Sequence, residues 1–171
     1  MFGPRGTGMV WGKAAAWKGV QGIIPCFEWK SLELWMQGKS PEGLPPGPRT
    51  SPGGFQSFDH RWALPEAFKF HEKIGRARVT ARIHELATRC KEALAKLPKV
   101  KLYTPKSEAL SAGLVCFDVE GLKPEEVVKK LAAKKIIASD TPYAPSYARL
   151  TPSLLNSPEE VDKTVAEIAA L

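Results

Sequence analysis

The chain has 171 residues, of which 43% are hydrophobic and 25% charged, with a formal net charge of +7. This is the composition of an ordinary globular protein and suits one domain, or one domain plus part of another. No stretch approaches the roughly 20 apolar residues that span a bilayer, and the N-terminus lacks a signal-peptide pattern. We therefore expect a cytoplasmic protein without a membrane partner.

The positive charge and the isoelectric point near 9.4 make an anionic partner conceivable. The basic residues are nevertheless interspersed with acids, as in residues 123–135, and no nucleic-acid-binding motif accompanies them. We expect no nucleic-acid partner and keep a salt-sensitive nucleic-acid binder only as a third alternative. Cys26, Cys90 and Cys116 have neither metal-ligand nor disulfide spacing, so no metal site is predicted.

Residues 1–12 predict a glycine-rich turn that runs into a short apolar strand. The turn matches neither the phosphate loop nor the dinucleotide fingerprint. Residues 13–54 show little periodicity and should be mostly loop. This part holds more large apolar side chains than a solvated loop carries, so we expect them to cover another surface, in a missing part of the domain or a second subunit. They are Trp17, Trp29 and Trp35, together with Trp11 just before this part.

Thr50, Ser51, Gly53 and Gly54 supply hydroxyls and backbone amides of the kind that bind phosphate. A plain turn explains the same residues, and the composition alone does not decide between the two.

Two helices are predicted next. Residues 59–74 form the first, with Pro65 in its first turn and Trp62, Phe68 and Ile74 as packing residues, and Gly75 ends it. Residues 76–97 form the second, which has one apolar stripe at helical spacing. The stripe consists of Ile83, Leu86, Ala87, Cys90, Ala93, Leu94 and Leu97. The three histidines, His60, His71 and His84, have no partner at a matching spacing and receive no catalytic role.

The remaining sequence predicts short strands at residues 100–103, 111–119, 136–138 and 147–151. The strand at 111–119 should be central and should bury Cys116. A helix that opens at Pro124 separates the second strand from the third, and a terminal helix closes the chain. These elements predict an α/β or α+β domain with a small, mainly antiparallel sheet covered on one face.

The stretch from Tyr143 to Asp162 carries the sharpest signals. Ser157, Pro158 and Glu160 form a capping box with proline at the first helical position. Val161, Val165 and Ile168 then recur on one helical face, so this helix should pack against the domain. Arg149 lies in the strand just upstream, and its planar guanidinium suits a carboxylate. A surface salt bridge is the alternative interpretation of this arginine.

The glycine turn at residues 2–8 and the C-terminal stretch from Arg149 to Asp162 together resemble the class V aminotransferase family of pyridoxal-phosphate (PLP) enzymes. The nearest branch resembles the isopenicillin N epimerase-like proteins. The resemblance implies the C-terminal part of a fold type I PLP enzyme, in which residues 1–58 belong to the large cofactor-binding domain and 59–171 form helices and the small domain.

By this resemblance the cofactor is PLP, and the lysine that attaches it in the family lies before Met1. Arg149 matches the family arginine that binds the substrate carboxylate, while Thr50, Ser51, Gly53 and Gly54 lie near the segment that holds the cofactor phosphate across a dimer. The implied partners are an amino-acid substrate and either a second copy or a lysine-bearing chain.

For function, the resemblance implies transamination or epimerisation of an amino acid, with an electron-withdrawing cofactor. Desulfuration ranks lower because the loop at residues 139–148 contains no cysteine, and a buried Cys116 would stay protonated. The alternative is a non-catalytic assembly or binding module that docks through the tryptophan-rich N-terminal third.

Overall fold

The computed structural model describes residues 3–22, 28–50 and 57–171. The chain forms two compact units, Met1–His71 and Glu72–Leu171. The prediction that residues 1–58 belong to a large domain and 59–171 to a small one stays a prediction.

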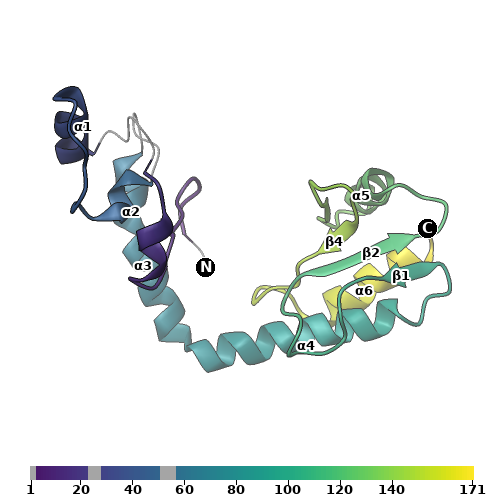
Figure 1. The fold of residues 1–171 in the computed structure, drawn as a ribbon. Coiled ribbons are helices and arrows are strands. Elements are labelled where there is room, and N and C mark those ends of the chain that lie inside the picture. Colours follow the sequence, from purple (N-terminus) through teal and green to yellow (C-terminus); the bar gives the residue numbers. More distant parts are fainter. Residues whose placement is uncertain (1–2, 23–27, 51–56) are drawn as a thin grey trace. The chain divides into compact units, whose positions relative to one another are not determined.

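The second unit is a small antiparallel sheet with helices (Figure 1). Its strands are β1 (Val100–Leu102), β2 (Val115–Val119), β3 (Ser139–Asp140) and β4 (Ala148–Leu150). They are ordered β1-β2-β4-β3, and every neighbouring pair is antiparallel. The helices are α4 (Arg76–Leu94), α5 (Pro124–Ala133) and α6 (Pro158–Ala169). This confirms the predicted α/β architecture, with β2 in the interior of the sheet.

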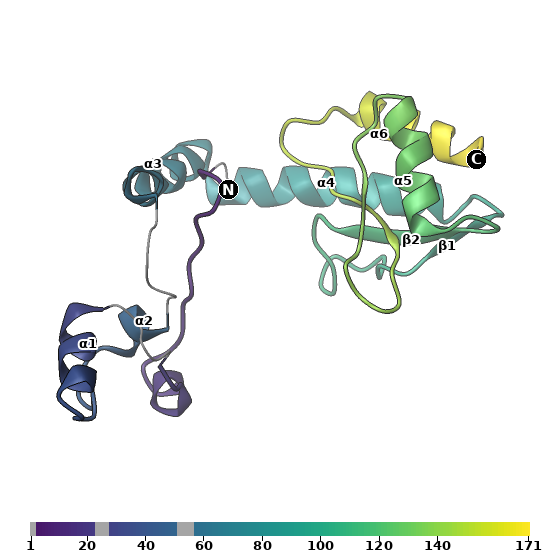
Figure 2. The ribbon, with the colours of Figure 1, turned by 90° about the horizontal axis from the view of Figure 1, so that it is seen from above.

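One face of this sheet builds the core. Burial alternates along β2 and β4 because successive strand residues point to opposite faces, so Val115, Phe117 and Leu150 are buried. The three helices supply the other half of the core (Figure 2). Their contribution consists of Leu86, Cys90 and Leu94 from α4, Val127 and Leu131 from α5, and Val161, Val165 and Ile168 from α6. Each large side chain buried here contributes about 1.5–3 kcal/mol.

The start of α6 follows the predicted capping box. Ser157 has an extended backbone, and its hydroxyl accepts a hydrogen bond from the backbone N–H of Glu160 at 3.2 Å. The Glu160 carboxylate accepts one in return from the backbone N–H of Ser157 at 3.1 Å. Two side-chain contacts join α6 and its entrance to α4: Arg89 Nε donates to Asp162 Oδ1 at 2.7 Å, and Arg82 Nη2 donates to the carbonyl of Asn156 at 2.9 Å.

Lys91 on α4 is a buried lysine that the sequence did not single out. Only 1% of the residue is exposed. Its ammonium donates to the carbonyls of Pro105 at 3.2 Å and Lys106 at 3.0 Å, and to Ser111 Oγ at 2.7 Å. These three acceptors all belong to the connection between β1 and β2, so Lys91 fixes that loop to α4.

Several predicted boundaries in this unit were wrong. The strand expected at 111–119 begins only at Val115, after Gly113, where an added Cβ would lie 2.9 Å from Ile83 Cγ2. Cys116 is half-buried, because it faces away from the core. The strand expected at 136–138 is displaced to β3, and Ile137 is 97% exposed. The long helix ends at Leu94 rather than at residue 97.

The first unit is mainly helical, with a 3-10 helix η1 (Ala16–Gly19) and helices α1 (Trp29–Met36), α2 (Pro46–Arg49) and α3 (Phe58–Ile74). The expectation that residues 13–54 are mostly loop missed α1. Glu28 caps the first turn of this helix, because the Glu28 carboxylate accepts a hydrogen bond from the backbone N–H of Ser31 at 2.8 Å. Residues 9–11 form no strand, because no other strand among the described residues of this unit pairs with them. Their side chains are exposed.

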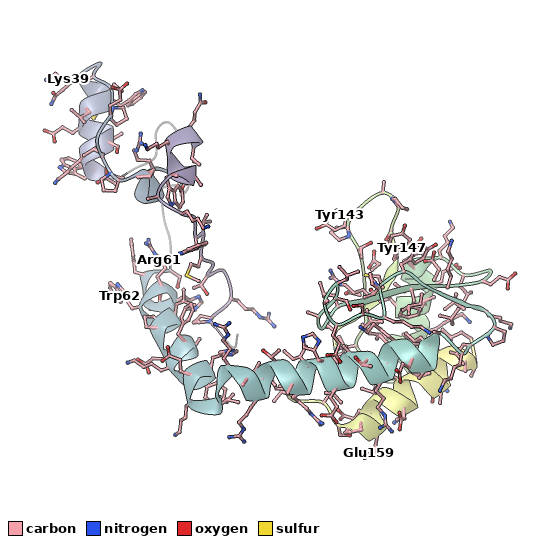
Figure 3. All side chains as sticks on the ribbon, turned by 60° about the horizontal axis from the view of Figure 1, so that its bottom comes forward. Lys39, Arg61, Trp62, Tyr143, Tyr147 and Glu159 are labelled. Atoms are coloured by element: carbon pink, nitrogen blue, oxygen red, sulfur yellow. The ribbon has the colours of Figure 1, made fainter. Side chains whose placement is uncertain are left out.

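The predicted helix at 59–74 exists as α3, but two details were wrong. Pro65 lies inside the helix rather than in its first turn. Trp62 is 76% exposed, and Figure 3 shows its side chain projecting from the helix, whereas Ala67 is the buried residue. Gly75 follows α3 with a positive φ of 95° that favours glycine, as predicted for a break. Within residues 3–22, 28–50 and 57–171, no helix is both long and apolar enough to cross a membrane.

Candidate functional site

Arg149 lies in the middle of β4, on the face of the sheet opposite to the core. Its neighbours Ala148 and Leu150 are buried, whereas Arg149 is half-buried. The register places Cys116 of β2 and Ser139 of β3 directly beside it, on the two sides of β4. We call this side of the sheet the open face; Lys101, Cys116, Asp118, Ser139 and Arg149 belong to it.

In the described part of the chain, a single side-chain hydrogen bond anchors the guanidinium of Arg149. Its Nε donates a hydrogen bond to Ser139 Oγ at 3.0 Å. No carboxylate among the described residues forms an ion pair with Arg149. The salt-bridge interpretation of this arginine is therefore not realised within that part of the chain, and its two Nη groups are available to an external anion.

Two tyrosines lie on the open face near Arg149. Tyr147 precedes Arg149 by two residues, and its ring packs on that of Tyr103 with centroids 4.1 Å apart. Lys101 Nζ lies 4.9 Å from the centre of the Tyr103 ring. A hydrogen bond with Asp118 raises the pKa of Tyr103 above its ordinary value. Sequence reasoning did not identify this cluster, although the period-two spacing of Lys101 and Tyr103 was the signal that could have found it.

The loop between β3 and β4 is closed at its base. Thr141 N–H donates to the carbonyl of Tyr147 at 2.9 Å, and Tyr147 N–H donates to Thr141 Oγ1 at 2.9 Å. Ser146 Oγ adds a hydrogen bond to the carbonyl of Thr141 at 2.7 Å. Tyr143 extends from the exposed part of the loop, as Figure 3 shows. The loop is therefore an ordered neighbour of Arg149.

The glycine-rich turn at the N-terminus is present. Gly6 has a positive φ of 78°, and the Thr7 hydroxyl donates to the carbonyl of Pro4 at 2.6 Å. Gly3 approaches α3 so closely that an added Cβ would lie 3.1 Å from Leu64 Cδ1. His60 Nδ1 lies 3.1 Å from the carbonyl of Arg5, which gives this histidine a structural contact with the turn.

The predicted phosphate-binding residues are only partly visible. Thr50 follows α2, and its hydroxyl donates to the carbonyl of Gly47 at 2.8 Å, so it would have to turn before donating to a phosphate. Ser51, Gly53 and Gly54 lie outside the described residues. Thr50 and Arg149 belong to different units.

A cavity of about 380 Å³ lies on the core side of the sheet. Its polar lining is largely engaged in local structure, since Asn156 donates to Glu160 at 3.1 Å, Thr164 donates to the Glu160 carbonyl at 2.8 Å, and Lys134 pairs with Glu167 at 3.4 Å. Because these polar groups are already bonded to one another around α6, we place the candidate site at Arg149 and not in this cavity.

The two cysteines of the second unit differ in environment. Cys90 is buried in the core, and burial raises the pKa of its thiol to about 12. Cys116 lies beside Arg149 on the open face, so the predicted burial of this residue was wrong. Cys116 nevertheless lies in β2, which is paired on both sides, and not in the loop at residues 139–148 where desulfuration was expected to need a cysteine. In the described part of the chain, no group of three His, Cys, Asp or Glu residues could hold a metal ion.

Comparison with solved structures identifies the architecture. The chain is similar to the apo structure of a cysteine desulfurase from Thermococcus onnurineus NA1, with 26% identity and a TM-score of 0.64, over 74% of this chain and 34% of that chain. It also shares the fold of a C-DES mutant with glycine covalently linked to its PLP cofactor. That match has 23% identity and a TM-score of 0.61, over 77% of this chain and 34% of that chain. The cysteine desulfurase CsdA from Escherichia coli shares the fold too, with 19% identity and a TM-score of 0.60, over 74% of this chain and 33% of that chain.

The chain thus has the fold of the C-terminal part of a fold type I PLP enzyme. The aminotransferase class-V family model matches residues 1–140, and the chain belongs to this family. That match ends before Arg149. The chain spans about one third of the length of the solved structures to which it is similar. A comparison with curated proteins gave no match.

PLP is the cofactor that membership of this family indicates. At the substrate end of such a site, Arg149 is the residue whose donors would suit a carboxylate, because no carboxylate in the described part of the chain pairs with it. The described residues do not show a fit at the phosphate end, because the Thr50 hydroxyl is bonded to Gly47.

Proposed function

We propose that this chain supplies the substrate-carboxylate-binding part of a PLP-dependent enzyme that acts on an amino acid. Membership of the class V aminotransferase family supports the class of enzyme. The observation that carries the residue assignment is the guanidinium of Arg149, which is anchored through Nε and free of ion pairs to described carboxylates.

Arg149 binds and orients the α-carboxylate of the substrate in this proposal. A guanidinium gives a carboxylate two parallel, charge-assisted hydrogen bonds, which fix its plane as well as its position. When PLP is bound, it supplies an electron sink for chemistry at the substrate Cα. The contribution of Arg149 is to hold that carbon in one orientation.

Among the reactions of such enzymes, we favour transamination or epimerisation, as in the isopenicillin N epimerase-like branch. The loop from Thr141 to Tyr147 contains no cysteine, which is the residue that desulfuration would require there. Cys90 is unsuitable because burial raises its pKa to about 12. Cys116 lies half-buried beside Arg149, and strand pairing on both sides holds its backbone in place.

A binding experiment tests the role of Arg149. The probe is N-(5′-phosphopyridoxyl)-L-alanine, a stable conjugate of cofactor and amino acid, and its comparison compound is the corresponding alaninamide. The 171-residue chain should bind the carboxylate more tightly than the amide. Arg149→Met should remove this preference, by about 10- to 100-fold, because hydrogen bonds to a charged group are lost.

Arg78→Met is the matched control, since Arg78 is an exposed arginine on α4 rather than on the open face. It should bind both compounds as the wild-type chain does. An unchanged preference for the carboxylate in Arg149→Met would refute the proposed function.

The exposed tryptophans favour a second candidate, an assembly module. Trp11, Trp29 and Trp35 are 78%, 73% and 50% exposed, and such apolar surface is typical of a docking site. A second copy or a lysine-bearing chain is the proposed partner. Sedimentation should then show association that Trp29→Ser weakens. Association without any carboxylate preference would favour this candidate over the enzyme.

A further inference from the structure

Among the described residues, Ser139 is the one whose side chain forms a hydrogen bond with the guanidinium of Arg149. The two residues are direct cross-strand partners in the β3–β4 ladder, so their side chains leave the sheet on the same face. Ser139 Oγ accepts the hydrogen bond from Arg149 Nε at 3.0 Å. This contact depends on the register of a two-residue strand, β3.

The contact restricts how a carboxylate can approach. A guanidinium can meet a carboxylate side-on, through Nε and one Nη, or end-on, through both Nη groups. Because Nε already donates to Ser139, the side-on edge is occupied. The end-on edge is left, and it has no carboxylate partner among the described residues.

The position of Ser139 is itself supported. The loop that begins at Thr141 returns to Tyr147, and the two residues exchange hydrogen bonds of 2.9 Å in each direction. These contacts continue the pairing of β3 with β4 just beyond Asp140. The backbone of Ser139 is therefore held beside β4 from both the strand and the loop.

We infer that Ser139 is a positioning residue, which orients Arg149 so that it binds the substrate carboxylate end-on, through both Nη groups. This inference rests on the proposed function. It assigns a role to the Ser139 hydroxyl that is separate from the stability of the sheet.

The test compares Ser139→Val with Ser139→Thr in the 171-residue chain. Threonine and valine share a branched shape that suits a strand and differ by the hydroxyl. The readout is the ratio of affinities for N-(5′-phosphopyridoxyl)-L-alanine and its alaninamide. Ser139→Val should lower this ratio about tenfold, the equivalent of one hydrogen bond, and Ser139→Thr should retain it.

A second readout is the NMR signal of the Arg149 Nε–H group. In the wild-type chain and in Ser139→Thr it should exchange slowly with solvent, and the probe should shift both Nη groups more than Nε. In Ser139→Val the Nε–H should exchange faster. This measurement reports on the hydrogen bond even where a variant loses stability.

The outcomes separate the two proposals. If Arg149→Met removes the carboxylate preference while Ser139→Val keeps it, the role of Ser139 is refuted and the proposed function stands. If the probe shifts Nε as strongly as Nη, end-on binding is refuted. If Arg149→Met leaves the preference unchanged, the proposed function fails, and the inference about Ser139 fails with it.

Discussion

Replacing Lys91 by methionine should destabilise the second unit while leaving the first unit intact. The ammonium of Lys91 donates three hydrogen bonds to the β1–β2 connection, at 3.2, 3.0 and 2.7 Å. A methionine side chain fills similar space but offers no donor. The substitution therefore isolates the contribution of the hydrogen bonds from that of the buried apolar stem.

The magnitude follows from two opposing effects. Hydrogen bonds to a charged group contribute about 1.5–3 kcal/mol each, but methionine also removes the cost of burying a charge, which is several kcal/mol. Pro105 and Lys106 are exposed residues, so water can reach their released carbonyls. We expect a net loss of about 2 kcal/mol, which lowers the unfolding temperature of a domain of this size by about 8–16 °C.

The distribution of aromatic residues gives each unit its own signal. All five tryptophans precede His71, and all three tyrosines follow it. Tyrosine near-ultraviolet dichroism should therefore show the earlier transition in Lys91→Met, while tryptophan fluorescence should be unchanged. Lys96→Met, at an exposed position near the end of α4, is the control. A tyrosine transition at the wild-type temperature in Lys91→Met would show that the three hydrogen bonds contribute no net stability.

Three further predictions concern the same unit. Ser157→Ala should lower the unfolding free energy measured by urea titration by about 1 kcal/mol, because α6 loses its cap. Ser157→Asp keeps a capping oxygen and should lose much less. Equal losses in the two variants would contradict the capping box. The hydrogen bond from Arg89 lowers the pKa of Asp162 below its ordinary value of 3.8. Its stabilising effect is therefore complete above that value and is lost as the pH falls through the lower, folded-state pKa. Urea midpoints measured in acid should show this loss in the wild-type chain, and a loss of the same size in Asp162→Asn would count against it. Finally, iodoacetamide should leave Cys90 unmodified in the folded chain near neutral pH, because its pKa is about 12; mass spectrometry that finds rapid labelling would disprove its burial.

Local signals explain what the sequence predicted well. The start of α6 depends on residues within four positions of one another, and the capping box was recognisable without any tertiary information. The placement of Arg149 in a short strand followed from the alternation of residues 147–151. The single covered face of the sheet followed from the apolar stripes of the helices around it.

Features that depend on distant partners were missed. The role of Ser139 requires the register between β3 and β4, which a two-residue strand does not reveal. Lys91 was overlooked because a lysine next to an apolar stripe is usually exposed, and only the loop folding back over it supplies its three acceptors. The short strand expected after the glycine turn, within residues 1–12, needs a neighbouring strand, and a sequence pattern cannot supply one.

The alternation of β4 makes the polar and apolar sides of the sheet inseparable. A shift of β4 by a single residue against β2 would move each side chain to the opposite face of the sheet. Leu150 would then face solvent, and the charged Arg149 would be buried in the hydrophobic core. Misaligned pairings are thus penalised by the same residue that is proposed to recognise the ligand. An arginine at this position enforces the correct strand alignment even before any substrate is present.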